Sequence, residues 1–254
     1  MGVKIKGVNM KVLGIDTSTR ACSVALVCEY DGLLAEYTLR DKRTHSEKLM
    51  PLVDKVLSDG RVDLSELSGI SAVIGPGSFT GLRIGLATAQ GLTTGYNLDL
   101  VGVPTLDVLA YGRPIKGLIC PVLDARKGEV YTCLYQGTGS GIKRLWEYRV
   151  ISMKELFSDL EELSNSMGQD ALETDAVEAM VFTGDGVAVF REELMENTSF
   201  EQVYTFQELE VNRASITAKL GLEKMKAGNI LSPHELNPLY IRKSEAEKNL
   251  HKKG

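Results

Sequence analysis

The sequence predicts a two-lobed α/β protein in which one structural unit occurs twice. With 254 residues, of which 43% are hydrophobic, the chain can form one large core or two of ordinary size. Apolar runs that suit strands alternate with segments of helical periodicity. Two landmarks then recur at nearly the same offset: 108 residues separate Asp16 from Asp124, and 109 separate Gly75 from Gly184. An offset of this length indicates a duplicated domain, because solenoid repeats are much shorter.

The first half is predicted to begin with a β-hairpin that carries an acid at its tip. Residues 10–15 form a buried strand ending at Asp16, and residues 22–27 return after a polar turn. A third strand follows over residues 33–39. The remaining elements are, in order, a helix over 44–57, a strand over 70–74, the turn Gly75-Pro76-Gly77 and a helix over 80–94.

The second half is predicted to follow the same plan. A strand over residues 117–123 ends at Asp124, and a single strand over 129–135 returns. Residues 180–183 form a strand that leads into a second glycine-rich turn. The polar stretch 164–178 is expected to be a surface loop, and the last long helix covers 213–227.

A duplicated β-β-β-α-β-α unit resembles the sugar-kinase/actin-like (ribonuclease-H-like) fold, in which two acidic hairpin tips face a nucleotide cleft. The predicted division has four parts: an N-terminal extension over 1–9, an N-terminal lobe over 10–112 that carries dimerisation, a C-terminal lobe over 113–242 and a charged tail over 243–254. Met10 is an alternative start residue.

Composition restricts the class of protein. A net charge of −5 argues against a chain that binds nucleic acid mainly through its own positive charge. The sequence contains neither an apolar signal core nor 18 consecutive apolar residues, so a cytoplasmic protein is expected. Cysteines 22, 28, 120 and 133 lack zinc-ligand spacing and are expected to be reduced, buried thiols.

The segment from Gly75 to Gly85 is the most specific stretch of the chain. It places a glycine-rich turn before a helix, where an anion could bind, although close packing explains the glycines better because the lysine of a phosphate-binding loop is missing. Within the helix, Gly81, Gly85 and Ala89 form a smooth stripe at intervals of four. Such a stripe indicates either a partner helix or complete burial within the lobe.

Four segments together resemble the TsaB family. They are LGIDTS at residues 13–18, THSEKLMPL at 44–52, GPGSFTGLRIG at 75–85 and LNPLYIR at 236–242. The resemblance is strong over residues 10–112 and looser in the second half.

This resemblance implies a scaffold rather than an enzyme. A member of this family would dimerise with a TsaD-like catalytic subunit and work with a TsaE-like ATPase. The assembly would transfer threonylcarbamoyl to the adenosine beside the anticodon of certain tRNAs. This chain would contact tRNA only as part of the complex. Alone, the chain would form a homodimer, and no membrane contact is expected.

The residue pattern also argues against catalysis. TsaD-like proteins bind a metal through a His-x-x-x-His helix, but Thr105 and Leu109 occupy the matching positions here. His45 is interpreted as a cap or packing residue, and the chain is expected to have neither a metal nor a tightly bound cofactor. The rival hypothesis is a stand-alone ATPase or small-molecule kinase that uses Asp16 and Asp124, and weak nucleotide binding stays open. A metalloprotease, the third hypothesis, would require stoichiometric metal.

The predicted docking surface lies on the helices over 44–57 and 80–94. Its residues are His45, Met50, Gly81, Gly85, Thr88, Ala89 and Leu92.

Overall fold

The computed structural model describes residues 9–40, 44–112, 116–138, 141–173, 179–197, 203–206 and 213–241, with the side chains of 167–173 and 204–206 excepted. The chain divides into two compact units. The first unit comprises Met1–Val108 with Val211–Pro238, and the second comprises Leu109–Glu210 with Leu239–Gly254. The predicted extension lies outside the described residues except for Asn9, and the charged tail lies wholly outside them.

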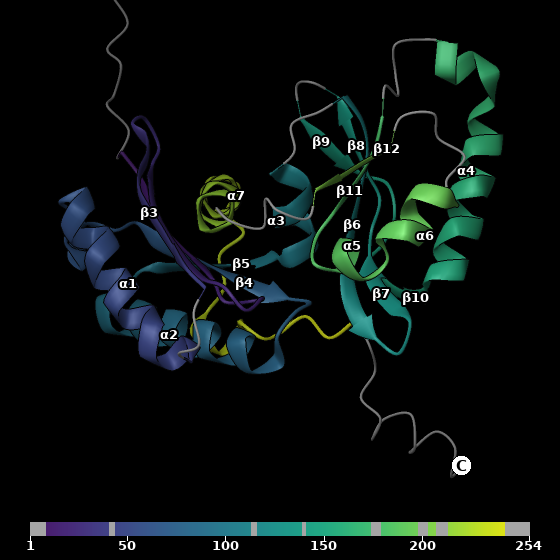
Figure 1. The fold of residues 1–254 in the computed structure, drawn as a ribbon. Coiled ribbons are helices and arrows are strands. Elements are labelled where there is room, and N and C mark those ends of the chain that lie inside the picture. Colours follow the sequence, from purple (N-terminus) through teal and green to yellow (C-terminus); the bar gives the residue numbers. More distant parts are fainter. Residues whose placement is uncertain are drawn as a thin grey trace, which may run out of the picture. The chain divides into compact units, whose positions relative to one another are not determined.

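The first unit contains a five-stranded sheet in the order β3-β2-β1-β4-β5, of which Figure 1 labels β3, β4 and β5. Strands β1, β2 and β3 are antiparallel, while β4 and β5 run parallel to β1. The strand bounds are β1 Lys11–Asp16, β2 Cys22–Cys28, β3 Gly32–Leu39, β4 Gly69–Gly75 and β5 Asp99–Pro104.

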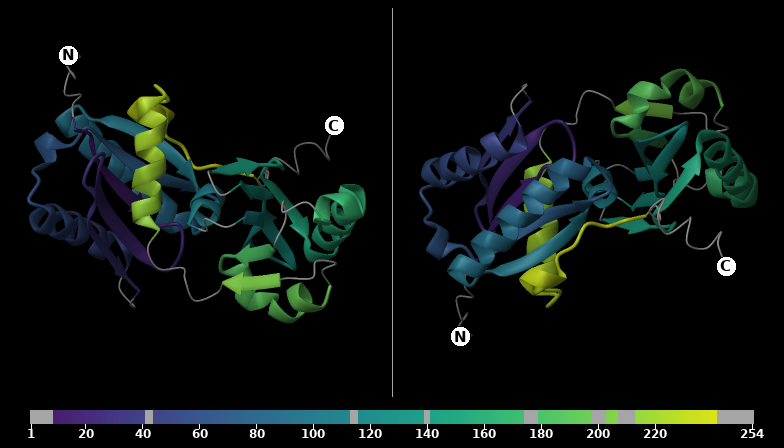
Figure 2. Two further views of the ribbon diagram at one scale, coloured as in Figure 1. Left: turned by 90° about the horizontal axis from the view of Figure 1, so that it is seen from above. Right: turned by 90° about the horizontal axis from the view of Figure 1, so that it is seen from below.

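Helices cover both faces of this sheet (Figure 2). Helices α1 and α2 contact each other and pack on one face, and α7 crosses the other face against β1, β2, β4 and β5. The bounds are α1 His45–Gly60, η1 Leu64–Glu66, α2 Phe79–Tyr96, α3 Thr105–Tyr111, α7 Ala214–Lys226 and η2 Pro233–Glu235. Helix α3 spans the boundary between the two units.

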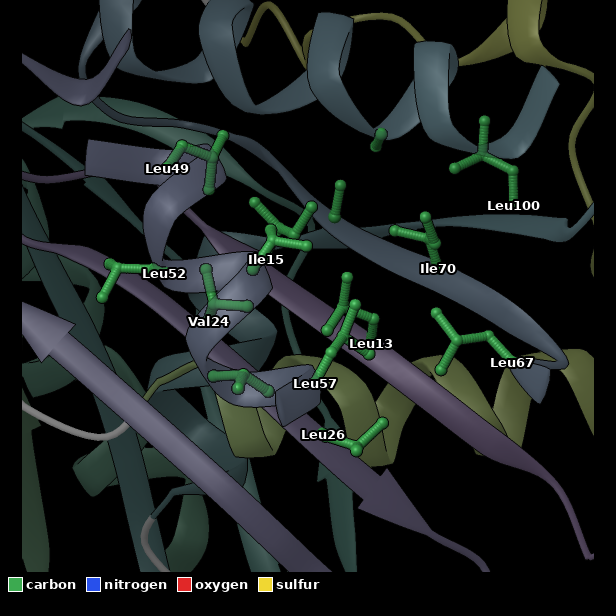
Figure 3. Packing of buried hydrophobic residues seen from close by; sticks show 14 of the residues in the cluster. Leu13, Ile15, Val24, Leu26, Leu49, Leu52, Leu57, Leu67, Ile70 and Leu100 are labelled. Carbon is green, nitrogen blue, oxygen red and sulfur yellow. The ribbon is translucent and has the colours of Figure 1, made fainter. Parts of the chain in front are cut away.

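Alternation along β1 explains why both faces are covered. Leu13 and Ile15 point into the core beneath α1 and α2, where Leu49 and Leu52 of α1 join them (Figure 3). Gly14, between them, faces α7: a Cβ there would lie 2.2 Å from the carbonyl oxygen of Ala214. The glycine therefore lets α7 lie directly on the strand.

The second unit repeats the first topology. Its main sheet has the order β10-β7-β6-β11-β12, with the same antiparallel and parallel pairings as the first, and this confirms the predicted duplicated fold. The bounds are β6 Lys116–Arg126, β7 Glu129–Thr132, β8 Tyr135–Thr138, β9 Ile142–Arg144, β10 Arg149–Ser152, β11 Met180–Thr183 and β12 Val203–Phe206, with helices α4 Met153–Glu173, α5 Gly186–Val189 and α6 Arg191–Glu196.

Three predictions about these elements were wrong. The strand expected over 129–135 is two strands, because β7 and β8 pair with different parts of β6. Most of the loop expected over 164–178 is helical: α4 continues to Glu173, since Leu156, Leu160 and Leu163 bury an apolar stripe. The C-terminal lobe expected over 113–242 loses α7, which packs on the first sheet.

Candidate functional site

The hairpin turn between β1 and β2 is held by a buried ion pair. Oδ2 of Asp16 lies 3.0 Å from Nε of Arg213, and both side chains are almost fully buried. Oδ1 of Asp16 accepts hydrogen bonds from the backbone N–H (2.9 Å) and the hydroxyl (2.6 Å) of Ser18. Oδ1 thus caps the hairpin turn through Ser18, and Oδ2 faces the guanidinium of Arg213.

The glycine-rich segment packs against this turn. The backbone N–H of Ser78 donates to the carbonyl oxygen of Ser18 at 2.6 Å, and the hydroxyl of Thr17 donates to the carbonyl oxygen of Gly81 at 2.8 Å. A Cβ at Gly81 would lie 2.1 Å from the carbonyl oxygen of Thr17, and one at Gly85 would lie 2.2 Å from its hydroxyl oxygen. The packing interpretation of these glycines is confirmed.

His45, the first residue of α1, also holds the hairpin turn. Its Nε2 lies 2.9 Å from the carbonyl oxygen of Thr19 and 3.3 Å from that of Ala21. Because carbonyl oxygens only accept, Nε2 carries the proton in this arrangement. The imidazole is half-buried and ties α1 to the turn, so the interpretation of His45 as a packing residue is confirmed.

The predicted docking stripe faces inward. Gly81, Gly85 and Ala89 are buried within the first unit, because this side of α2 lies against Thr17 and the sheet. Their assignment to an accessible surface was wrong, and a bulky residue at Gly85 or Ala89 would disturb the core. Of the other predicted residues, Met50 is exposed and Thr88 and Leu92 are half-buried.

A second stripe of small residues on α2 faces outward, and the sequence reasoning missed it. Ala87, Gly91 and Gly95 are exposed, and a Cβ at either glycine would meet nothing within 4 Å. The two stripes have the same spacing of four. Leu82 and Leu86 beside the first stripe are the signal that could have assigned it to the core.

The acid of the second unit is also paired locally. Asp124 accepts a hydrogen bond from the backbone N–H of Arg126 at 2.8 Å and forms an ion pair with its guanidinium at 3.0 Å. In addition, the backbone N–H of Asp124 donates to Oδ1 of Asp185, which belongs to the second glycine-rich turn.

The positions that match a metal helix lie in the core. Thr105 is fully buried at the start of α3, and Leu109 is 6% exposed. Across the described ranges, no three histidine, cysteine or acidic side chains are grouped closely enough to hold a metal ion. The four cysteines are free and buried, as predicted, and burial raises the pKa of the Cys120 thiol to about 12. Within the same ranges no helix is both long and apolar enough to cross a membrane.

Comparison with known proteins identifies the family. The family model described as TsaD, tRNA N6-adenosine threonylcarbamoyltransferase, matches residues 32–250. The tRNA threonylcarbamoyladenosine biosynthesis protein TsaB of Bacillus subtilis is 34% identical over 240 residues, which cover 94% of this chain and 96% of that protein. The chain belongs to the TsaB family. TsaB of Escherichia coli is 36% identical over 159 residues, or 61% of this chain and 68% of that protein.

Solved structures agree with this assignment. YeaZ from Pseudomonas aeruginosa has a TM-score of 0.70 at 25% identity and covers 91% of this chain and 99% of its own. An uncharacterised protein with similarity to peptidase YeaZ, also from Pseudomonas aeruginosa, has a TM-score of 0.73 at 26% identity and covers 92% and 100%. The resemblance to the TsaB family, drawn from four motifs, is confirmed. This family belongs to tRNA threonylcarbamoyladenosine biosynthesis.

Proposed function

We propose that the chain is a non-catalytic, activating subunit that docks through α1 and α2 onto a TsaD-like catalytic subunit. The observation that carries this proposal is the outward face of α2, where Ala87, Gly91 and Gly95 leave the backbone open to close approach by another helix. Phe79, 58% exposed, begins the same helix, with the guanidinium of Arg83 stacked 3.8 Å from its ring centroid. A single exposed apolar side chain is ordinary on a protein surface, so Phe79 adds contact area to this face without marking it by itself.

The internal pairing of the carboxylates supports a role without chemistry. Asp16 is engaged by Ser18 and Arg213, and Asp124 is engaged by Arg126. The assembly, with a TsaE-like ATPase, would transfer threonylcarbamoyl to the adenosine beside the tRNA anticodon in the cytoplasm. This chain would stabilise the active arrangement of its partner, meet tRNA only through the complex and pair with itself when alone.

The test is the light-scattering mass of the purified chain, alone and mixed with a TsaD-like protein from the same source. A heterodimer that displaces a homodimer is expected. Gly91→Arg should weaken the heterodimer at least about tenfold, since each factor of ten corresponds to 1.4 kcal/mol and a charged side chain would enter the contact. Gly141→Arg, at an exposed glycine of the second unit with open space around it, is the matched control and should bind normally.

Besides normal binding of Gly91→Arg, two results would overturn the proposal. One is the absence of association at high concentration of both proteins. The other is magnesium-dependent ATP turnover by the chain alone that Asp16→Asn abolishes, which would instead support a stand-alone nucleotide enzyme.

A further inference from the structure

A groove of about 640 Å³ lies where α1 and α2 end, next to the proposed docking face. Asp54, Ser58 and Arg61 line it from α1 and its C-cap, and Asp63 lines it from the segment before η1. Tyr96, the last residue of α2, closes another side. All of these residues belong to the first unit.

The groove continues the proposed docking face along both helices. On α1, exposed Met50, Asp54 and Ser58 follow one another at intervals of four and therefore lie on one side of the helix. On α2, Thr88 and Leu92 lead to Tyr96 at the same interval. A helix that lies along these two rows reaches the groove at their end.

The electrostatics of the groove favour a cation. Both helices end at the groove, so the negative ends of two helix dipoles meet there. The structure describes both helices along their whole length, and neither has a basic residue in its last turn. The exposed carboxylates of Asp54 and Asp63 add two negative charges, against one positive charge from Arg61. The same balance disfavours nucleic acid as the occupant.

Tyr96 adds a surface that suits a planar cation. Its side chain is 49% exposed at the rim of the groove, with a polar hydroxyl and an apolar ring. An arginine side chain can stack on such a ring and at the same time donate two hydrogen bonds to a carboxylate. A lysine ammonium, a point charge, would use only part of this site.

We infer that the groove receives an arginine side chain of the docked catalytic subunit, an inference that rests on the proposed function. The guanidinium stacks on Tyr96 and pairs with Asp54 or Asp63. Because this contact is electrostatic and lies at the edge of the interface, it sets the register of the two α-helical faces and makes the affinity depend on salt.

The experiment measures the dissociation constant of the full-length heterodimer by calorimetry at low and high ionic strength. Asp54→Lys should weaken binding about tenfold at low salt and reduce the salt dependence, since it places a cation beside the incoming one. Tyr96→Ala should weaken binding by a similar factor, whereas Tyr96→Phe, which keeps the ring, should bind normally. Glu223→Lys is the matched charge reversal, on an exposed position of α7 across the sheet.

The outcomes distinguish a failure of this inference alone from a failure of the proposed function. If Gly91→Arg abolishes binding while Asp54→Lys and Tyr96→Ala bind as tightly as the parent chain, docking stands and the groove inference is overturned. If Gly91→Arg also binds normally, the docking proposal fails and the groove inference fails with it. If Asp54→Lys weakens only the homodimer, the occupant is a second copy of this chain, which likewise overturns the inference.

Discussion

Two glycines six positions apart in α2 have opposite surroundings. A Cβ at Gly85 would lie 2.2 Å from the hydroxyl oxygen of Thr17, whereas one at Gly91 would meet open space. We therefore expect Gly85→Ala to lower the free energy of unfolding by about 1–3 kcal/mol through overpacking. The same change at Gly91 should raise it by up to about 1 kcal/mol, since alanine is the better helix former.

Urea denaturation of the two variants and the parent chain measures both changes, and each variant serves as the control for the other. Equal changes of the same sign would mean that Thr17 moves aside at no cost. In that case the glycines would have to be explained by something other than contact with the hairpin turn.

Single residues also mark the limit of what the sequence can predict. The acid at the hairpin tip, Asp16, is predicted from the end of a strand. The cation beside this acid, Arg213, could not be predicted from the sequence. It also contacts Ser18 of the same turn, 195 residues away along the chain, and no sequence pattern relates positions so far apart. Removing Arg213 alone would leave the carboxylate of Asp16 buried without its counter-charge.

At the scale of elements, an exposed cluster connects α1 to the edge strand β3. The hydroxyl of Tyr37 on β3 donates to Asp59 on α1, and Nζ of Lys55 lies 2.9 Å from the same carboxylate. The hydrogen bond from Tyr37, followed by that from Lys55, lowers the pKa of Asp59 below its ordinary value. The contact therefore depends on an ionised carboxylate.

The lowered pKa of Asp59 determines the pH range in which this carboxylate stabilises the folded state. A carboxyl group with a lowered folded-state pKa adds stability above its unfolded pKa, and this is lost as the pH falls through the folded value. Asp59→Asn should thus lower the unfolding temperature near about pH 7, and the difference from the parent should vanish near about pH 2. Asp54→Asn, which removes another exposed carboxylate of the same helix, is the control variant. A difference that persists in acid would show that Asp59 acts through packing rather than charge.

The sequence predicts the positions of helices and strands well where the periodicity of apolar residues matches the side of the element that is buried. Helix α1 carries its apolar residues at helical spacing and was found within a few residues of its predicted bounds. The miss in α4 has a physical cause: serine, asparagine and glycine after Leu163 are weak helix formers, and a helix already anchored at Leu156 and Leu160 continues through them.

For the whole molecule, two repeated landmarks predict the duplication, but they do not predict that a helix from the second half of the chain packs on the first sheet. Helix α7 follows the last strand of the second sheet just as α3 follows the last strand of the first. It nevertheless packs on the first sheet, where the hydroxyl of Ser71 donates to the carbonyl oxygen of Thr217 at 2.8 Å. Repeated spacing predicts the order of elements along the chain and carries no information about which sheet a helix covers.

The first unit is discontinuous because α7 comes from the second half of the chain. A fragment can test whether the unit folds without this helix. The predicted lobe over residues 10–112 lacks α7, so one face of its sheet would be exposed. The large apolar residues Leu220, Leu222 and Met225 are buried in α7, and their loss corresponds to roughly 5–9 kcal/mol, as much as many domains have in total. The fragment should show no cooperative thermal transition by circular dichroism, and adding a peptide of residues 211–241 should restore one. A fragment that melts cooperatively by itself would mean that the first unit folds without α7.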